Sequence, residues 1–173
     1  SVHDLIERGA KKALLISATG TGKTYASAFA MRNEKPKKAL FIVHRELIAR
    51  QALKSYKKVF GSMKKLALLS GNSKEYDADI LFATMSMMAK TETLERYKVD
   101  EFDWICIDEV HRAGSESYQK IMNYFQPDFW LGMTASPERT DGFDIFNLFD
   151  HNIAYEIRLQ HALKEDLLCP FHY

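Results

Sequence analysis

Short, uninterrupted apolar runs recur along the chain, separated by segments in which apolar residues return at helical spacing. Continuous apolar runs are typical of strands that are buried on both faces of a parallel sheet, whereas half-exposed strands alternate between apolar and polar residues. The pattern predicts strands at residues 13–17, 39–43, 66–69, 80–83, 104–107 and 129–133.

The segments between these runs have the periodicity of amphipathic helices. They predict helices at residues 23–31, 46–60, 85–90 and 115–125. Strands that alternate with helices form repeated β-α-β units, so the expected fold class is α/β, a mostly parallel sheet with right-handed crossovers and helices on both faces. Sheets of this kind bind ligands outside the carboxyl ends of their strands.

The composition is that of an ordinary globular domain, with 173 residues of which 46% are hydrophobic. The 24 Lys and Arg residues nearly balance the 23 Asp and Glu residues, so any nucleic-acid contact must come from a local arrangement of charges. The lysine pairs at 57–58 and 64–65 are interpreted as solvated faces. Cys106 and Cys169 have no metal-ligand spacing, and no signal peptide or membrane-spanning run is visible. We therefore expect a soluble, cytoplasmic protein.

A glycine-rich segment, Ser-Ala-Thr-Gly-Thr-Gly-Lys-Thr, follows the first predicted strand at residues 17–24. A strand that leads through such a segment into a helix presents backbone N–H groups and the positive end of the helix dipole to phosphate oxygens. Lys23 can reach the β- and γ-phosphates, and the Thr24 hydroxyl can bind Mg²⁺. The strict phosphate-loop pattern has Gly where this chain has Ser17. We assign nucleotide binding to Thr19, Gly20, Thr21, Gly22, Lys23 and Thr24.

A pair of carboxylates, Asp108 and Glu109, follows the predicted strand at 104–107. One carboxylate can hold the Mg²⁺ shell, and its neighbour can orient or deprotonate an attacking water. Together the two motifs predict a nucleotide triphosphatase that binds ATP or GTP. Thr24 and one of the two carboxylates are the expected metal ligands, and the other carboxylate is the expected general base.

Further polar motifs follow other predicted strands, at residues 44–51, 84–86 and 134–142. In this order the motifs strongly resemble those of the first RecA-like motor domain of superfamily 2 helicases. Within that group they are most similar to the DEAD/DEAH-box relatives grouped with the motor subunits of type III restriction enzymes. The resemblance covers residues 1–173 as one helicase ATP-binding domain and implies a RecA-like P-loop NTPase fold.

The resemblance assigns Mg²⁺ binding to Thr24 and Asp108 and catalysis to Lys23, Asp108 and Glu109, with Glu109 as the base. It also implies roles for residues outside the nucleotide motifs. It assigns coupling between nucleotide and nucleic acid to His111, Thr134 and Ser136. It assigns contact with the nucleic-acid backbone to Arg45 and Thr84 and, more loosely, to Ser70 and Gly71. It implies an adenine-recognising glutamine before Ser1 and a second RecA-like domain with an arginine finger beyond Tyr173, so the isolated chain should hydrolyse ATP only weakly.

Local structure offers a second interpretation of several of these residues. Arg45 and Glu46 could form only a charged first helical turn, in which the helix dipole favours the glutamate. Thr84 could cap the helix that follows it. Thr134 and Ser136 could belong to a strand-end turn ahead of a proline.

The predicted function is that of the N-terminal, ATP-binding motor domain of an ATP-dependent helicase or translocase that acts on DNA rather than RNA. Two alternatives stay open. The first is a restriction-system subunit that translocates on duplex DNA without unwinding it. The second is an RNA-binding sensor that uses ATP as a switch.

Overall fold

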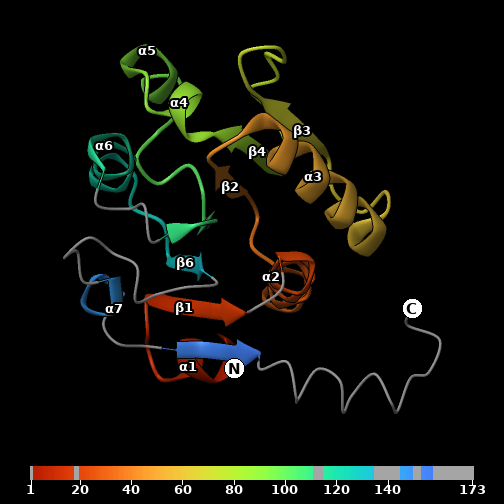
Figure 1. The fold of residues 1–173 in the computed structure, drawn as a ribbon, viewed down its shortest axis with the longest axis vertical. Helices are drawn as coiled ribbons and strands as arrows, with labels where there is room; N and C mark the ends of the chain where they lie inside the picture. Colours follow the sequence, from red (N-terminus) through yellow and green to blue (C-terminus); the bar gives the residue numbers. More distant parts are fainter. Residues whose placement is uncertain (1, 18–19, 111–114, 135–144, 150–152, 158–173) are drawn as a thin grey trace.

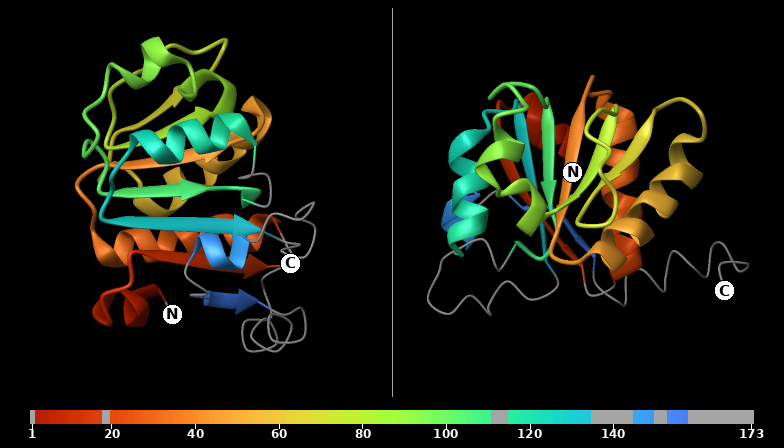
Figure 2. Two further views of the ribbon diagram at one scale, coloured as in Figure 1. Left: turned by 90° about the vertical axis from the view of Figure 1, so that its left-hand side faces the viewer. Right: turned by 90° about the horizontal axis from the view of Figure 1, so that it is seen from above.

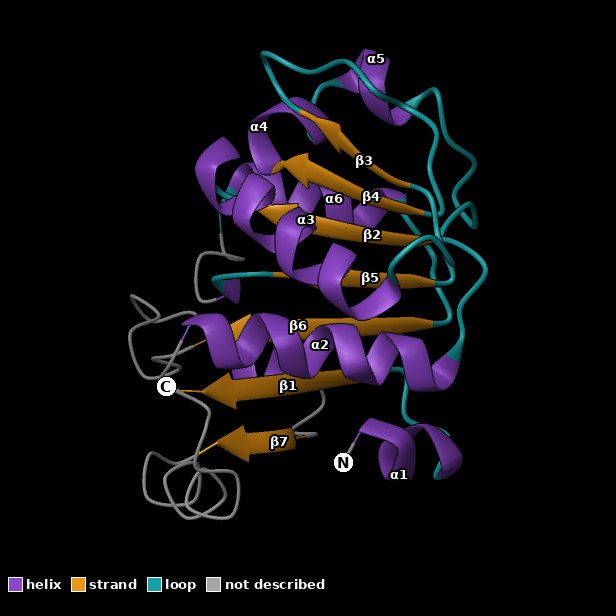
Figure 3. Cartoon of the chain, turned by 90° about the vertical axis from the view of Figure 1, so that its right-hand side faces the viewer, coloured by secondary structure: helices purple, strands orange, loops and turns teal. Residues whose placement is uncertain are grey.

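The computed structural model describes residues 2–17, 20–110, 115–134, 145–149 and 153–157, which form a seven-stranded sheet (Figure 1). The strand order is β3-β4-β2-β5-β6-β1-β7, and each pairing of neighbouring strands is parallel. The strands are β1 (Lys12–Ser17), β2 (Ala39–Val43), β3 (Leu66–Leu69), β4 (Ile80–Thr84), β5 (Trp104–Ile107), β6 (Phe129–Thr134) and β7 (Ile153–Ile157). Their carboxyl ends therefore meet at one edge of the sheet, towards which the arrows in Figure 3 point.

Helices cover both faces of the sheet, as the view from above in Figure 2 shows. One face is covered by α1 (Val2–Glu7), α2 (Gly20–Glu34) and α3 (Glu46–Phe60). The other face is covered by α4 (Met85–Met88), α5 (Thr91–Leu94), α6 (Glu116–Tyr124) and α7 (Ile145–Leu148). The sheet thus separates two apolar layers, each closed by its own helices.

Neighbouring residues of a central strand pack into opposite layers. In β2, Phe41 and Val43 pack on the side of α2 and α3, whereas Leu40 and Ile42 pack on the side of α4 and α6. All residues of β2 are buried. A strand with no solvent-facing side has no position that favours a polar residue, which is why these strands are continuous apolar runs in the sequence.

The predicted α/β class and all six predicted strands are confirmed. The bounds of β2, β3 and β5 are those predicted, and β1, β4 and β6 are each one residue longer. The apolar pattern does not predict β7, in which Glu156 interrupts the run, or the short helices α5 and α7. Because β7 lies at the sheet edge and pairs with β1 alone, it does not need a fully apolar sequence.

The helices also differ from the prediction at their ends. The helix expected at 23–31 begins at Gly20, so the glycine-rich segment supplies its first turn. The helix expected at 115–125 spans Glu116–Tyr124, and the hydroxyl of Ser115 caps it by accepting from the N–H of Tyr118. None of the described helices is long and apolar enough to cross a membrane.

Gly132 of β6 lies beside Leu14 of β1 and Ile107 of β5, where the sheet packs against the buried ring of Phe149. A Cβ atom at Gly132 would lie 2.6 Å from Cζ of Phe149. We predict that Gly132→Ala lowers the free energy of unfolding by about 1–3 kcal/mol, because the ring must shift within a close-packed layer.

Urea unfolding of Gly132→Ala and of a matched control, Gly71→Ala, measures this effect. A Cβ atom at Gly71 would meet no atom within 4 Å, so the control should unfold at nearly the wild-type midpoint. Equal midpoints for the two variants would contradict the prediction.

Candidate functional site

The candidate phosphate-binding residues lie where β1 ends and α2 begins. β1 ends at Ser17 and α2 begins at Gly20, so the N-terminus of α2 lies at the carboxyl edge of the sheet. The first turn of α2 contains no acidic residue, so the dipole of this helix start can attract an external anion without competition from a local carboxylate. Thr19, one of the predicted nucleotide-binding residues, lies outside the described residues.

Lys23 and Asp108 form a buried ion pair between this helix start and the end of β5. Lys23 Nζ lies 3.1 Å from Asp108 Oδ1, and the two residues are 6% and 7% exposed. Removing either charge would leave the other buried without a partner, which is costly in a poorly solvated environment. The pair holds a cation and an anion side by side. The ammonium is suited to bind phosphate oxygens, and the carboxylate is suited to bind the Mg²⁺ ion that accompanies the phosphate.

The backbone around Asp108 holds both carboxylates at the strand end. The N–H of Asp108 donates to the carbonyl of Ile42 at 2.9 Å and continues the pairing of β5 with β2. The Tyr118 hydroxyl of α6 donates to the Asp108 carbonyl at 3.3 Å. Glu109 has a φ of +52°, a left-handed conformation that costs roughly 1–3 kcal/mol for a residue other than glycine. Its N–H donates to Asp108 Oδ1 at 2.9 Å, which ties the strained residue to the ion pair.

A cavity of about 300 Å³ brings the predicted catalytic groups together. Its wall on one side is formed by Lys23, Thr24, Asp108 and Glu109. Ile48, Gln51, Ala52 and Ser55 of α3 line the same cavity. Three elements that are distant in sequence therefore enclose one space in which a cation, a hydroxyl and two carboxylates meet.

Gln51 and Ser55 are polar lining residues to which the sequence assigned no role. They lie four positions apart on α3 and so share a helix face. That spacing is visible in the sequence, but it does not indicate that the face lines the same cavity as Lys23 and Asp108. The packing of α3 against α2 decides this (Figure 3).

The carboxyl edge of the sheet has two halves, which contain different candidate contacts. The candidate nucleic-acid contacts follow β2, β3 and β4, which are neighbours in the sheet, and the nucleotide motifs follow β5 and β1 on the other side of β2. Along the chain the two sets of motifs are interleaved. The strand order thus separates the candidate nucleic-acid contacts from the nucleotide motifs, although the two sets alternate along the chain. β2 is the boundary between the two halves of the edge.

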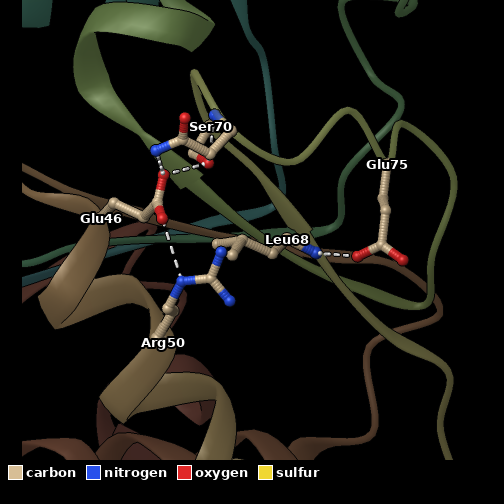
Figure 4. A network of polar contacts seen from close by, with 6 residues as sticks. Glu46, Arg50, Leu68, Ser70 and Glu75 are labelled. Atoms are coloured by element: carbon tan, nitrogen blue, oxygen red, sulfur yellow. Dashed lines mark hydrogen bonds and ion pairs between the residues drawn. The ribbon is translucent and has the colours of Figure 1, made fainter.

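Glu46, the first residue of α3, is the centre of a polar network in the first of these halves (Figure 4). Its Oε1 accepts hydrogen bonds from the Ser70 hydroxyl at 2.5 Å and the Asn72 amide at 3.2 Å, and its Oε2 accepts from Arg50 Nε at 2.9 Å. The Ser70 hydrogen bond is the main cause that lowers the pKa of Glu46. The Glu75 carboxylate accepts a hydrogen bond from the N–H of Leu68 at 2.8 Å. This contact holds the far end of the segment that contains Ser70 and Asn72.

The other candidate contacts differ in exposure. Arg45 is exposed at the N-cap of α3, and Gly71 is exposed beyond the end of β3. Ser70 and Thr84 are buried, and the Ser70 hydroxyl is committed to Glu46. Thr84 is the N-cap residue of α4, but its side chain makes no capping hydrogen bond.

Of the predicted coupling residues, the structure describes Thr134, which is fully buried as the last residue of β6. His111 and Ser136 lie outside the described residues. Met87, Met88, Trp104 and Trp130 are buried in the two apolar layers.

Helicase domains are among the solved structures with a similar fold. A hypothetical ATP-dependent RNA helicase from Sulfolobus tokodaii superposes with a TM-score of 0.70 at 19% identity, covering 88% of this chain and 49% of that one. The Pyrococcus furiosus Hef helicase domain superposes with a TM-score of 0.66 at 19% identity, covering 90% of this chain and 37% of that one. The fold is therefore that of a RecA-like helicase domain.

The family model of the type III restriction enzyme res subunit matches residues 1–139. The chain belongs to this family. It is 26% identical over 180 residues to the type I restriction enzyme EcoAI endonuclease subunit of Escherichia coli, covering 97% of this chain and 22% of that protein. It is 25% identical to the putative ATP-dependent helicase IRC3 of Saccharomyces cerevisiae, covering 95% of this chain and 26% of that protein. The chain thus spans about a quarter of the length of these relatives.

We predict that Ser70→Ala raises the pKa of Glu46 towards its usual value of 4.5, because the carboxylate loses the donor that most favours its charged form. A lowered pKa in the folded state means that the stabilisation is fully present above pH 4.5 and is lost as the pH falls through the pKa of folded Glu46.

An NMR titration of the carboxyl carbons measures this shift directly. Glu101, whose pKa is lowered mainly by a hydrogen bond from Lys38, is the internal control and should titrate unchanged. If Glu46 titrates identically in wild type and Ser70→Ala, the Ser70 hydroxyl does not stabilise the carboxylate.

Proposed function

We propose that this chain is the ATP-binding motor domain of an ATP-dependent DNA helicase or translocase. The observation that carries the proposal is the buried pair of Lys23 and Asp108, which shares a cavity with Thr24 and Glu109 at the carboxyl edge of a RecA-like sheet. Family membership supports it, as do the relatives whose names describe ATP-dependent helicases.

The proposed nucleotide site uses the start of α2 for the phosphates. The backbone N–H groups of the first turn and the Lys23 ammonium bind the β- and γ-phosphate oxygens. Thr24 and Asp108 hold Mg²⁺, which supplies positive charge that neutralises the triphosphate. Glu109 accepts a proton from the attacking water, whose position the cavity between α2, β5 and α3 defines.

A second cavity, of about 470 Å³, supports a nucleotide over inorganic phosphate alone. It lies between α1 and α2, includes Gly22, and has an apolar lining that contains Val2, Ala26 and Phe29. A space next to the phosphate-binding turn with this lining suits the flat, apolar faces of a purine base.

Nucleic acid is the proposed partner of the edge half formed by the ends of β2, β3 and β4. Arg45 and Gly71 are exposed there, and an arginine or a backbone N–H can bind phosphate oxygens without reading base sequence. We favour DNA because restriction endonuclease subunits are among the relatives. One relative is named as a putative RNA helicase, so an RNA-binding role is the second candidate.

Movement along the polymer requires two states with different affinity for it. We propose that a second RecA-like domain of the same polypeptide closes on this edge when ATP binds and supplies an arginine to the transition state. His111, Thr134 and Ser136 follow β5 and β6 in the chain and are the proposed contacts that report the nucleotide state to that domain.

We predict that Lys23→Ala in the full-length protein weakens ATP binding, because the β- and γ-phosphates lose their contact with the Lys23 ammonium. Glu109→Gln should instead preserve ATP binding and reduce turnover by about 10²–10⁴-fold, the usual range for loss of a general base. ATP hydrolysis without polymer and with single-stranded DNA, duplex DNA or RNA, each beside the Glu109→Gln control, measures both effects.

Normal turnover in Glu109→Gln would show that the base is another residue. Stimulation by RNA alone would replace the DNA assignment.

We predict that Arg45→Ala lowers the affinity for polynucleotide and reduces the slope of log affinity against log salt by about one phosphate contact, with ATP binding unchanged. Lys58→Ala, which removes an exposed cation near the other end of α3, is the matched control and should retain the wild-type slope. Fluorescence anisotropy at several salt concentrations gives both slopes. Identical slopes for Arg45→Ala and wild type would return Arg45 to a purely structural role.

A further inference from the structure

Tyr56 of α3 is fully buried, and its hydroxyl reaches the helix that bears the phosphate-binding turn. The ring packs against Phe41, Phe60 and Phe82 with centroid separations of 5.4, 5.9 and 5.0 Å. The hydroxyl lies 2.7 Å from Oγ of Ser27 in α2, which is also fully buried. One tyrosine thus joins the apolar layer to a polar contact between two helices.

The direction of these hydrogen bonds follows from the number of protons. Ser27 Oγ donates to the carbonyl of Thr24 at 2.7 Å, which uses its single hydrogen. The Tyr56 hydroxyl must therefore donate to Ser27 Oγ. Burial raises the pKa of Tyr56 well above its usual value, so the phenol keeps this proton across the physiological range. A directed chain of hydrogen bonds runs from Tyr56 through Ser27 to Thr24.

α3 also contacts the other half of the edge. Its N-cap residue is the exposed Arg45, and its first residue, Glu46, binds Ser70 and Asn72 beyond β3. Its middle lines the cavity that Lys23 and Asp108 also line. A single helix therefore has fixed polar contacts with the candidate nucleic-acid half at its start and with the phosphate-binding turn through Tyr56.

We propose that Tyr56 is a positioning residue through which α3 transmits nucleic-acid contact at Arg45 to the Thr24 turn of the nucleotide site. A rigid helix that shifts or tilts when its start binds a phosphate backbone moves the Tyr56 hydroxyl, and with it Ser27 and the backbone of Thr24. The inference rests on the proposed function, since it requires ATP hydrolysis that nucleic acid stimulates.

A buried tyrosine whose hydroxyl satisfies a neighbour is also an ordinary packing feature, and the chain contains a matched example. The Tyr97 hydroxyl donates to the carbonyl of Tyr76 at 2.6 Å, in the apolar layer on the other side of the sheet. Tyr97→Phe removes one hydrogen bond of the same kind in the other apolar layer, across the sheet from the contact between Tyr56 and Ser27. This control variant distinguishes a loss of protein stability from a loss of coupling between nucleic-acid contact and ATP hydrolysis.

The experiment measures ATP turnover of the full-length protein at saturating ATP, without and with polynucleotide, for wild type, Tyr56→Phe, Ser27→Ala, the double variant and Tyr97→Phe. We expect the stimulation factor to fall by about fivefold or more in Tyr56→Phe and in Ser27→Ala, within the range of measured allosteric couplings. The double variant should be no worse than either single variant, because both remove the same link. Tyr97→Phe should retain the wild-type stimulation factor, whatever its effect on the unfolding temperature.

Three results would overturn the inference. If Tyr56→Phe retains the wild-type stimulation factor, or if Tyr97→Phe lowers it equally, the hydroxyl contributes to stability alone. If wild type hydrolyses ATP without any response to polynucleotide, the proposed function itself fails and the inference with it. If Tyr56→Phe does not fold, Ser27→Ala and its comparison with Tyr97→Phe decide the question.

Discussion

The burial of two opposite charges at one end of the sheet is the constraint on which the site depends. Lys23 and Asp108 lie 85 positions apart in the chain and 3.1 Å apart in space. A lone ammonium or carboxylate at this depth would cost several kcal/mol (~3–5 for breaking a buried pair), so each charge requires the other. Their contact in turn requires that β5 and β1 lie in the same sheet, separated only by β6, and that α2 begins where β1 ends. The contact between Lys23 and Asp108 thus depends on the strand order of the sheet.

The same order gives β2 a special position. It pairs with β4 on one side and with β5 on the other, so it belongs to both halves of the edge. The helix that leaves it, α3, packs on α2 while its first turn is held by the Glu46 network. In the proposed function, binding of a polymer at one half must alter chemistry at the other. A helix anchored at both halves meets this requirement without any change in the sheet.

The sequence predicted most of the fold and singled out several of the residues that line the candidate nucleotide cavity, for identifiable physical reasons. Strands buried on both faces, such as Ala39–Val43, produce apolar runs that need no knowledge of their neighbours. Phosphate-binding turns and strand-end carboxylates are local motifs, so Lys23 and Asp108 could be assigned before the fold was known. The Glu46 network could not, because Ser70 and Asn72 are 24 and 26 positions away and no local pattern relates a helix start to a distant loop. Gln51, Ser55 and Tyr56 were missed for the same reason, since their contacts are made by helix packing.

The ion pair also explains how one site can be stable before a ligand binds and still accept one. In the proposed function, Lys23 exchanges Asp108 for phosphate oxygens, and Asp108 exchanges Lys23 for Mg²⁺. Each charge gives up one partner of opposite sign for another, so neither is left buried and unpaired. Phosphate alone would satisfy Lys23 but leave Asp108 facing a second anion, and Mg²⁺ alone would leave Lys23 beside a cation. The pair therefore favours the metal and the triphosphate together over either one by itself. The strained backbone of Glu109, whose N–H is bonded to Asp108 Oδ1, is coupled to that exchange through the same oxygen that Lys23 contacts.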